Sequence, residues 1–140
     1  MTTLMLRWNE TVADSPRRSR TVTGTLWTLQ ILSAAMFLFA GSLKLAGAPP
    51  MVQQFAIIGL GQWFRYFTGG IEVASAVLLL IPAAAAYGAA ALAVTMVGAI
   101  ITHVFILGGS PVIPIVLLGS TVTIAWLRGI DRRVTITSRS

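Results

Sequence analysis

The central part of this chain carries almost no charge. Between Thr21 and Leu127 the charged residues are Lys44, Arg65 and Glu72, and the single histidine, His103, lies in the same stretch. The whole chain is 56% hydrophobic and 10% charged, whereas a soluble domain carries about 25% charged residues. A charge in a hydrocarbon layer is costly, so these few ionisable residues are candidates for a functional site. The composition predicts an integral membrane protein.

Four apolar runs are candidate membrane spans, because a helix needs about 20 residues to cross the hydrocarbon core and only the fourth run is clearly shorter than that. Proline and glycine separate the runs. The predicted fold class is therefore all-α, an integral membrane four-helix bundle, with spans at approximately 24–45, 63–81, 83–107 and 112–127.

The segment 51–62 is too short to span, and Gln53, Gln54 and Gln62 interrupt its apolar residues. We expect an interfacial or partly re-entrant helix there, with an ordinary connecting loop as the alternative.

The arginines predict the topology. Eight of the nine lie in two basic tails, 1–23 and 128–140, and Arg65 is the exception. The positive-inside rule then places both tails in the cytoplasm of a multi-pass protein of the bacterial inner membrane. The net charge of +6 does not indicate nucleic-acid binding, because arginines that flank membrane helices are explained by topology and lipid headgroups. Cysteine is absent, which excludes disulfide and thiolate chemistry on this chain.

Small residues recur every four positions in the third predicted span. One row is formed by Ala85, Ala89 and Ala93, and a second row contains Ala86, Ala90 and Gly98. Such rows let membrane helices approach closely. We expect this helix to be the most enclosed of the four, and a homodimer interface is the alternative use of the rows.

The predicted topology brings the ionisable residues to one half of the membrane. Lys44, Glu72 and His103 come from three different helices, and Arg65 precedes Glu72 by about two turns on nearly the same face. These four residues are candidates for binding a ligand or relaying protons, for example by hydrogen bonding to a quinone carbonyl. The alternative is structural: Lys44 and Glu72 lock two helices together, or Lys44 extends to the headgroups. No catalytic residue and no metal site are predicted.

Several segments resemble one family. Gly41–Leu45, Phe67–Val73, Pro82 and Ile101–His103 are similar to the corresponding parts of the DoxX family of small four-helix membrane proteins. The resemblance extends over roughly Leu26 to Leu127. It implies roles in quinone-linked redox systems, among them a thiosulfate:quinone oxidoreductase subunit. A more distant similarity to the acetylcholine-receptor chaperone NACHO implies an assembly factor.

These observations lead to two main functional hypotheses. The first is an accessory subunit of a membrane redox system, not an enzyme on its own, whose buried Lys/Glu/His site binds a quinone or a lipid-like ligand. A quinone is the only cofactor candidate, and the expected partners are the lipid bilayer and a redox or membrane protein. The second is a membrane-protein chaperone in which the Lys/Glu/His set is structural. A transporter or proton channel is a third and weaker hypothesis, because no continuous polar stripe runs along the helices.

Overall fold

The computed structural model describes residues 20–137, apart from the side chains of Val134 and Thr135. Within this range the chain is helical, with no strand, so the predicted all-α class is confirmed. The elements in order are α2 (Arg20–Ala46), α3 (Pro49–Ile58), α4 (Gln62–Leu79), α5 (Ala85–Thr102), the π-helical turn η1 (His103–Leu107) and α6 (Val112–Thr137).

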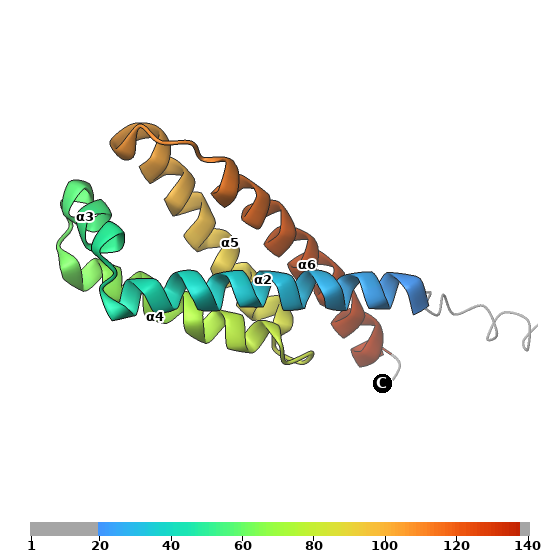
Figure 1. Cartoon of the computed structure of the whole chain (residues 1–140). Coiled ribbons are helices and arrows are strands. Elements are labelled where there is room, and N and C mark those ends of the chain that lie inside the picture. Colours follow the sequence, from blue (N-terminus) through green and yellow to red (C-terminus); the bar gives the residue numbers. More distant parts are fainter. Residues whose placement is uncertain (1–19, 138–140) are drawn as a thin grey trace, which may run out of the picture.

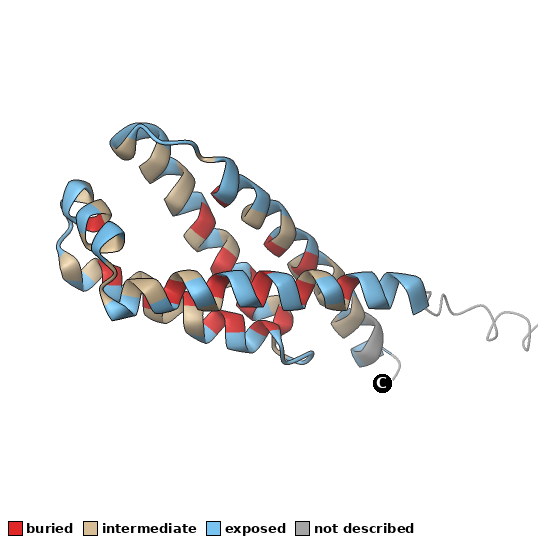
Figure 2. Cartoon of the chain, viewed as in Figure 1, coloured by how far each residue is buried: buried red, intermediate tan, exposed pale blue. Residues whose placement is uncertain are grey.

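Three helical segments of the described chain are long and apolar enough to cross a membrane: Arg20–Ala46, Ala85–Leu107 and Val112–Arg133. Their outer faces carry large apolar side chains, such as Phe39 with 65% and Phe105 with 80% of its surface exposed. Figure 2 shows exposed residues along every helix and buried residues where the helices meet. A bundle that exposes so much apolar surface is suited to lipid.

The helices pack as two pairs. α2 lies against α4 and α5 lies against α6, and α4 and α5 join the two pairs. Figure 1 shows the pairs crossing each other, with the first turn of α2 and the last turns of α6 at the same end of the molecule. The core lies at the crossing, and its largest fully buried apolar side chains are Phe37, Leu79, Leu92 and Ile124.

α5 packs through one face only. Ala85 and Ala89 are fully buried, whereas Ala90 and Gly98 of the second small-residue row are exposed. The prediction that this helix is the most enclosed is wrong, since α4 buries six of its 18 residues and α5 five of its 18. The physical reason is that small residues let one face approach α4 and α6 closely, while nothing in the described chain covers the face that carries Ala90 and Gly98.

The helix ends differ in places from the predicted spans. α6 continues to Thr137, ten residues beyond Leu127, and α3 forms a helix where a connecting loop was the alternative. Most of the predicted N-terminal tail, residues 1–19, lies outside the described range. The division into two tails and a membrane domain stays a prediction.

Candidate functional site at the end of α2

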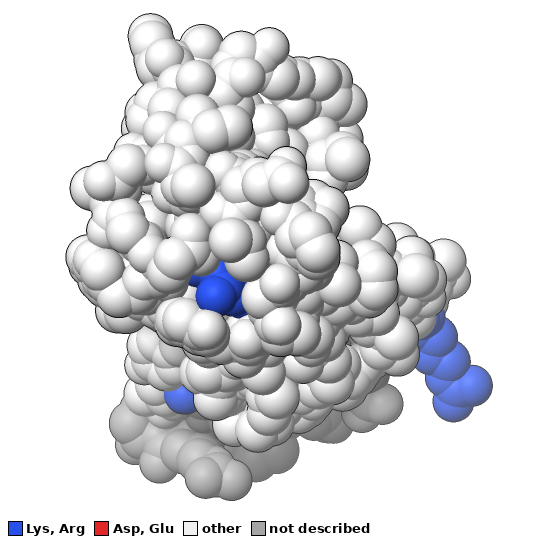
Figure 3. Space-filling view, turned by 60° about the vertical axis from the view of Figure 1, so that its left-hand side comes forward, with Lys and Arg blue, Asp and Glu red and all other residues white. Residues whose placement is uncertain are grey.

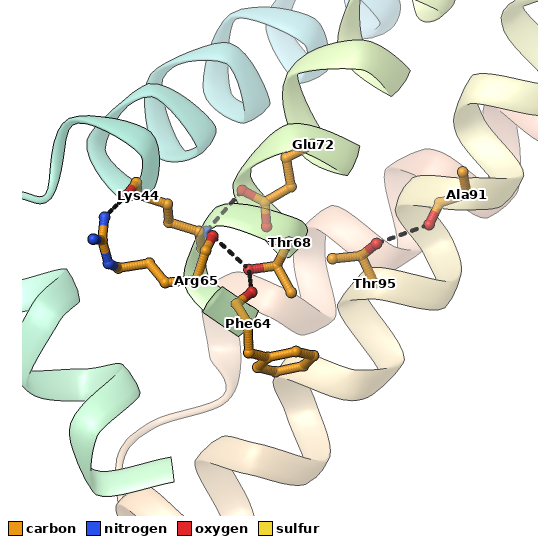
Figure 4. A network of polar contacts seen from close by, with 7 residues as sticks. All are labelled: Lys44, Phe64, Arg65, Thr68, Glu72, Ala91 and Thr95. Atoms are coloured by element: carbon orange, nitrogen blue, oxygen red, sulfur yellow. Dashed lines mark hydrogen bonds and ion pairs between the residues drawn. The ribbon is translucent and has the colours of Figure 1, made fainter. Parts of the chain in front are cut away.

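Lys44 and Glu72 form an ion pair between α2 and α4. The Lys44 Nζ atom donates a hydrogen bond to Glu72 Oε2 at 2.7 Å, and the exposed fractions of the two side chains are 15% and 3%. The pair is possible because α2 and α4 approach closely at Gly41 and Gly69, each three residues before one member of the pair. Figure 4 shows the pair bridging the two helices.

Arg65 binds the end of α2 and not the carboxylate. Its guanidinium donates from Nη1 to the main-chain carbonyl of Lys44. The last carbonyls of a helix lack partners within the helix, and a cation there also opposes the negative end of the helix dipole. Gly47, with φ +71°, turns the chain directly after α2, and the position of a Cβ on it lies 3.6 Å from the guanidinium nitrogens. A Cβ at that distance would make an ordinary contact, so it is the positive φ that favours glycine at this turn.

Gln62 extends this network to α3, which the sequence interpretation did not include. Gln62 Oε1 accepts a hydrogen bond of 2.7 Å from Arg65 Nε. Gln62 Nε2 donates to the carbonyl of Val52 at 3.1 Å. The signal was present, because Gln62 is a polar residue beside an aromatic cluster that includes Phe55 and Phe64, whose ring centroids lie 5.9 Å apart. The network thus fixes α3 over this end of the α2–α4 pair.

This end of the molecule presents few charges to the surface. Figure 3 shows the face on which the α3 side comes forward, and lysine or arginine atoms are visible at the bottom of a hollow surrounded by uncharged atoms. Arg65 is 3% exposed. A ligand that reached this site from this face would meet uncharged residues before any charge.

His103 does not join the hydrogen bonds of Lys44, Arg65 and Glu72. Its Nδ1 atom pairs with the carbonyl of Ala99, one turn earlier in its own helix, at 2.8 Å. It begins η1, which lies against α3. Of the four candidates, the structure connects Lys44, Arg65 and Glu72, and it leaves His103 on η1, which packs against α3.

A second polar cluster, absent from the predicted site, lies at the other end of the bundle. Gln30 is fully buried. Its Nε2 atom donates to the carbonyl of Leu79 at 2.6 Å, and its Oε1 atom accepts from Nε and Nη2 of Arg128 at 2.9 and 2.5 Å. The cluster joins α2, α4 and α6. The signal in the sequence was a glutamine within the first apolar span, 24–45.

The chemistry available at the first site is that of hydrogen bonding and charge. The ammonium of Lys44 has three donors, and Glu72 accepts from one of them. Because Lys44 is the more exposed member of the pair, it is the group that could donate to a carbonyl or an anionic oxygen of a ligand. Among residues 20–137, no cluster of three His, Asp or Glu side chains is placed to hold a metal ion.

Comparison with known proteins gives one match. The model of a family described as the DoxX-like family matches residues 28–126, a range that includes Lys44, Arg65, Glu72, His103 and Gln30. No curated protein and no solved structure matches the chain.

Proposed function

The chain belongs to the DoxX-like family, as its sequence resemblance predicted, and from this we propose that it is an accessory subunit of a membrane redox system. Its Lys44–Glu72 site binds the polar head of a quinone or of a lipid-like ligand. The observation that carries the proposal is the ion pair itself, which places a partly accessible ammonium beside a carboxylate of 3% exposure within an apolar bundle.

An ion pair of this kind is a poor device for stability alone. Removing two charges from water costs several kcal/mol per ion, and apolar replacements of similar size are often as stable. Close packing at Gly41 and Gly69 already joins α2 to α4. A role in ligand binding would explain why the charges of Lys44 and Glu72 are present, because the ammonium can donate a hydrogen bond to a carbonyl oxygen of the ligand.

The proposal includes a membrane arrangement. α4 has 18 residues, about 27 Å of helix, and it lies along α2 from the Lys44–Glu72 pair to the Gln30–Leu79 hydrogen bond. Because α2 is long and apolar enough to span, we take α4 as a fourth span beside it. Both chain ends then face the cytoplasm of the bacterial inner membrane, as the arginine distribution favours.

The test is direct quinone binding. The full chain, purified in detergent, is titrated with a menaquinone and a ubiquinone of short side chain, and the bound fraction is measured by equilibrium dialysis. Lys44→Met is expected to weaken binding at least tenfold, because it removes the donor, and Lys44→Arg to retain part of it. The matched control is Arg20→Gln, which removes an exposed cation from the opposite end. Equal binding by folded Lys44→Met and the unaltered chain would disprove the quinone site.

A separate variant tests whether His103 takes part in the proposed function. If it relays protons to the ligand, His103→Gln keeps binding but alters the rate of quinone reduction by a supplied redox partner. A rate that is unchanged over a range of pH removes His103 from the proposal and leaves the Lys44–Glu72 site intact.

The second candidate is an assembly factor for other membrane proteins. It is favoured by the fact that Lys44 and Glu72 satisfy each other, while large apolar side chains such as Val94, 73% exposed, cover the outer faces. A capture experiment discriminates the two. Partner capture that survives Glu72→Gln but is lost on deletion of the basic tails supports the assembly factor.

A further inference from the structure

The polar end of α6 forms a second surface, separate from the Lys44–Glu72 site. We propose that Arg132 and Arg133, supported by Arg128, bind the phosphate of an anionic phospholipid headgroup in the leaflet that meets this end of the bundle. The proposal does not depend on the proposed quinone site, since it concerns different residues at the opposite end of the helices.

Charge is the first support. The starting turn of α2 and the last turns of α6 bring Arg20, Arg128, Arg132 and Arg133 to one end of the described chain, where Asp131 is the one acidic residue. At the other end, Arg65 is buried, Lys44 is 15% exposed, and both are engaged in hydrogen bonds. The excess of positive charge on the described surface is therefore confined to the end that contains Arg132 and Arg133.

Two of these guanidinium groups are held in place by aromatic rings. Arg132 lies over the ring of Tyr87 with its Cζ 4.6 Å from the centroid, and Arg128 lies over Trp27 at 5.2 Å. Arg128 is also fixed by its two hydrogen bonds to Gln30. A guanidinium that is already oriented loses less entropy when it binds an oxyanion, and its planar donors suit phosphate.

The position along α6 fits a headgroup. From Val112 to Arg132 the helix rises about 30 Å, which is the thickness of the hydrocarbon core. If α6 enters the membrane at its first turn, Arg132 and Arg133 reach the phosphate layer on the other side.

The apolar side chains around the arginines favour a lipid over free phosphate. Trp126 is 68% and Ile130 40% exposed, and both precede Arg132 on α6 by six residues or fewer, on the side of the hydrocarbon core. Acyl chains would cover such residues, while inorganic phosphate would not. Basic pockets between membrane helices bind anionic headgroups for the same reason.

Native mass spectrometry of the full chain tests the proposal. Delipidated protein is mixed with phosphatidylglycerol or phosphatidylcholine, and the fraction with one bound lipid is measured. The unaltered chain is expected to prefer phosphatidylglycerol. Arg132→Gln should reduce that preference roughly fivefold, the equivalent of about 1 kcal/mol for one basic residue near the surface. Tyr87→Leu should reduce it in the same direction, and Asp131→Asn should increase it.

Arg20→Gln is the matched control. It removes the same charge at the same end, but Arg20 is not one of the two arginines, Arg128 and Arg132, that lie over aromatic rings. A loss equal to that of Arg132→Gln would mean that only total charge matters, and it would overturn the site. Displacement of the bound phosphatidylglycerol by an equal concentration of inorganic phosphate would show that the site binds phosphate and not a lipid. Equal retention of both lipids by the unaltered chain would overturn the proposal entirely.

Discussion

Gly41 and Gly69 face each other across the contact of α2 and α4. A Cβ on Gly41 would lie 3.0 Å from the carbonyl oxygen of Gly69, and a Cβ on Gly69 would lie 3.1 Å from that of Gly41. Neither backbone can yield without moving a helix. This mutual approach sets the separation at which Lys44 and Glu72 meet.

Gly69→Ala is expected to separate α2 from α4 and to weaken the bundle. The new methyl group would lie 3.0 Å from Lys44 Cβ as well as against the Gly41 carbonyl, and such overpacking costs about 1–3 kcal/mol. Thermal unfolding in detergent measures the effect. Gly70→Ala is the control, because a Cβ at Gly70 meets no atom within 4 Å and alanine favours a helix. Similar melting temperatures for the two variants would contradict the prediction.

Gly88→Ala should disturb the contact of α4 with α5 even more. A Cβ there would lie 2.6 Å from the carbonyl oxygen of Ser75 and 3.0 Å from the nitrogen of Leu79. Both atoms belong to the backbone, so a rotamer change cannot relieve the clash, and the expected loss is at the upper end of about 1–3 kcal/mol. Gly98→Ala, on the open side of α5, should be neutral or slightly stabilising. Unfolding in increasing denaturant compares the two.

Replacement of the ion pair should show an asymmetry. Lys44→Met leaves the carboxylate of Glu72 buried without its cation, whereas Glu72→Leu leaves Lys44, which is 15% exposed and can extend to water or headgroups. We therefore expect Lys44→Met to lower the free energy of unfolding more than Glu72→Leu does. The expected loss approaches about 3–5 kcal/mol, which is typical of removing one partner of a buried ion pair. Thermal unfolding in detergent measures both losses.

The double variant Lys44→Met/Glu72→Leu should recover much of the lost stability, because no uncompensated charge remains. Unfolding of the two single variants and the double variant completes a double-mutant cycle. Strictly additive losses would show that the two side chains do not interact.

Gln30→Leu is expected to lower stability by about 1–3 kcal/mol, the cost of leaving a buried polar group without its partner. It removes the donor to Leu79 and the acceptor for Arg128. Gln53→Leu makes the same chemical change at an exposed position on α3 and serves as the control. In the Gln30→Leu background, Arg128→Ala should cost less than it does alone. An equal cost in both backgrounds would argue against coupling.

Much of the fold follows from local properties of the sequence. Apolar length and the requirement that backbone groups in lipid pair within a helix predict membrane helices, and prolines and glycines indicate where they end. Lys44, Arg65 and Glu72 could be identified as candidate site residues because charged residues are rare in the apolar part of the chain, and this required no knowledge of their contacts. These properties are nearly additive along the chain, so they are visible before the chain is folded.

The tertiary structure alone decided which polar groups meet. Arg65 binds the carbonyl of Lys44, Gln30 binds Arg128 ninety-eight residues away, and His103 pairs within its own helix. These outcomes depend on the rotation and depth of each helix, which the close backbone contacts at Gly41, Gly69 and Gly88 constrain. Periodicity gives the face of a helix but not its register against a neighbour, and hydrogen bonds require the register.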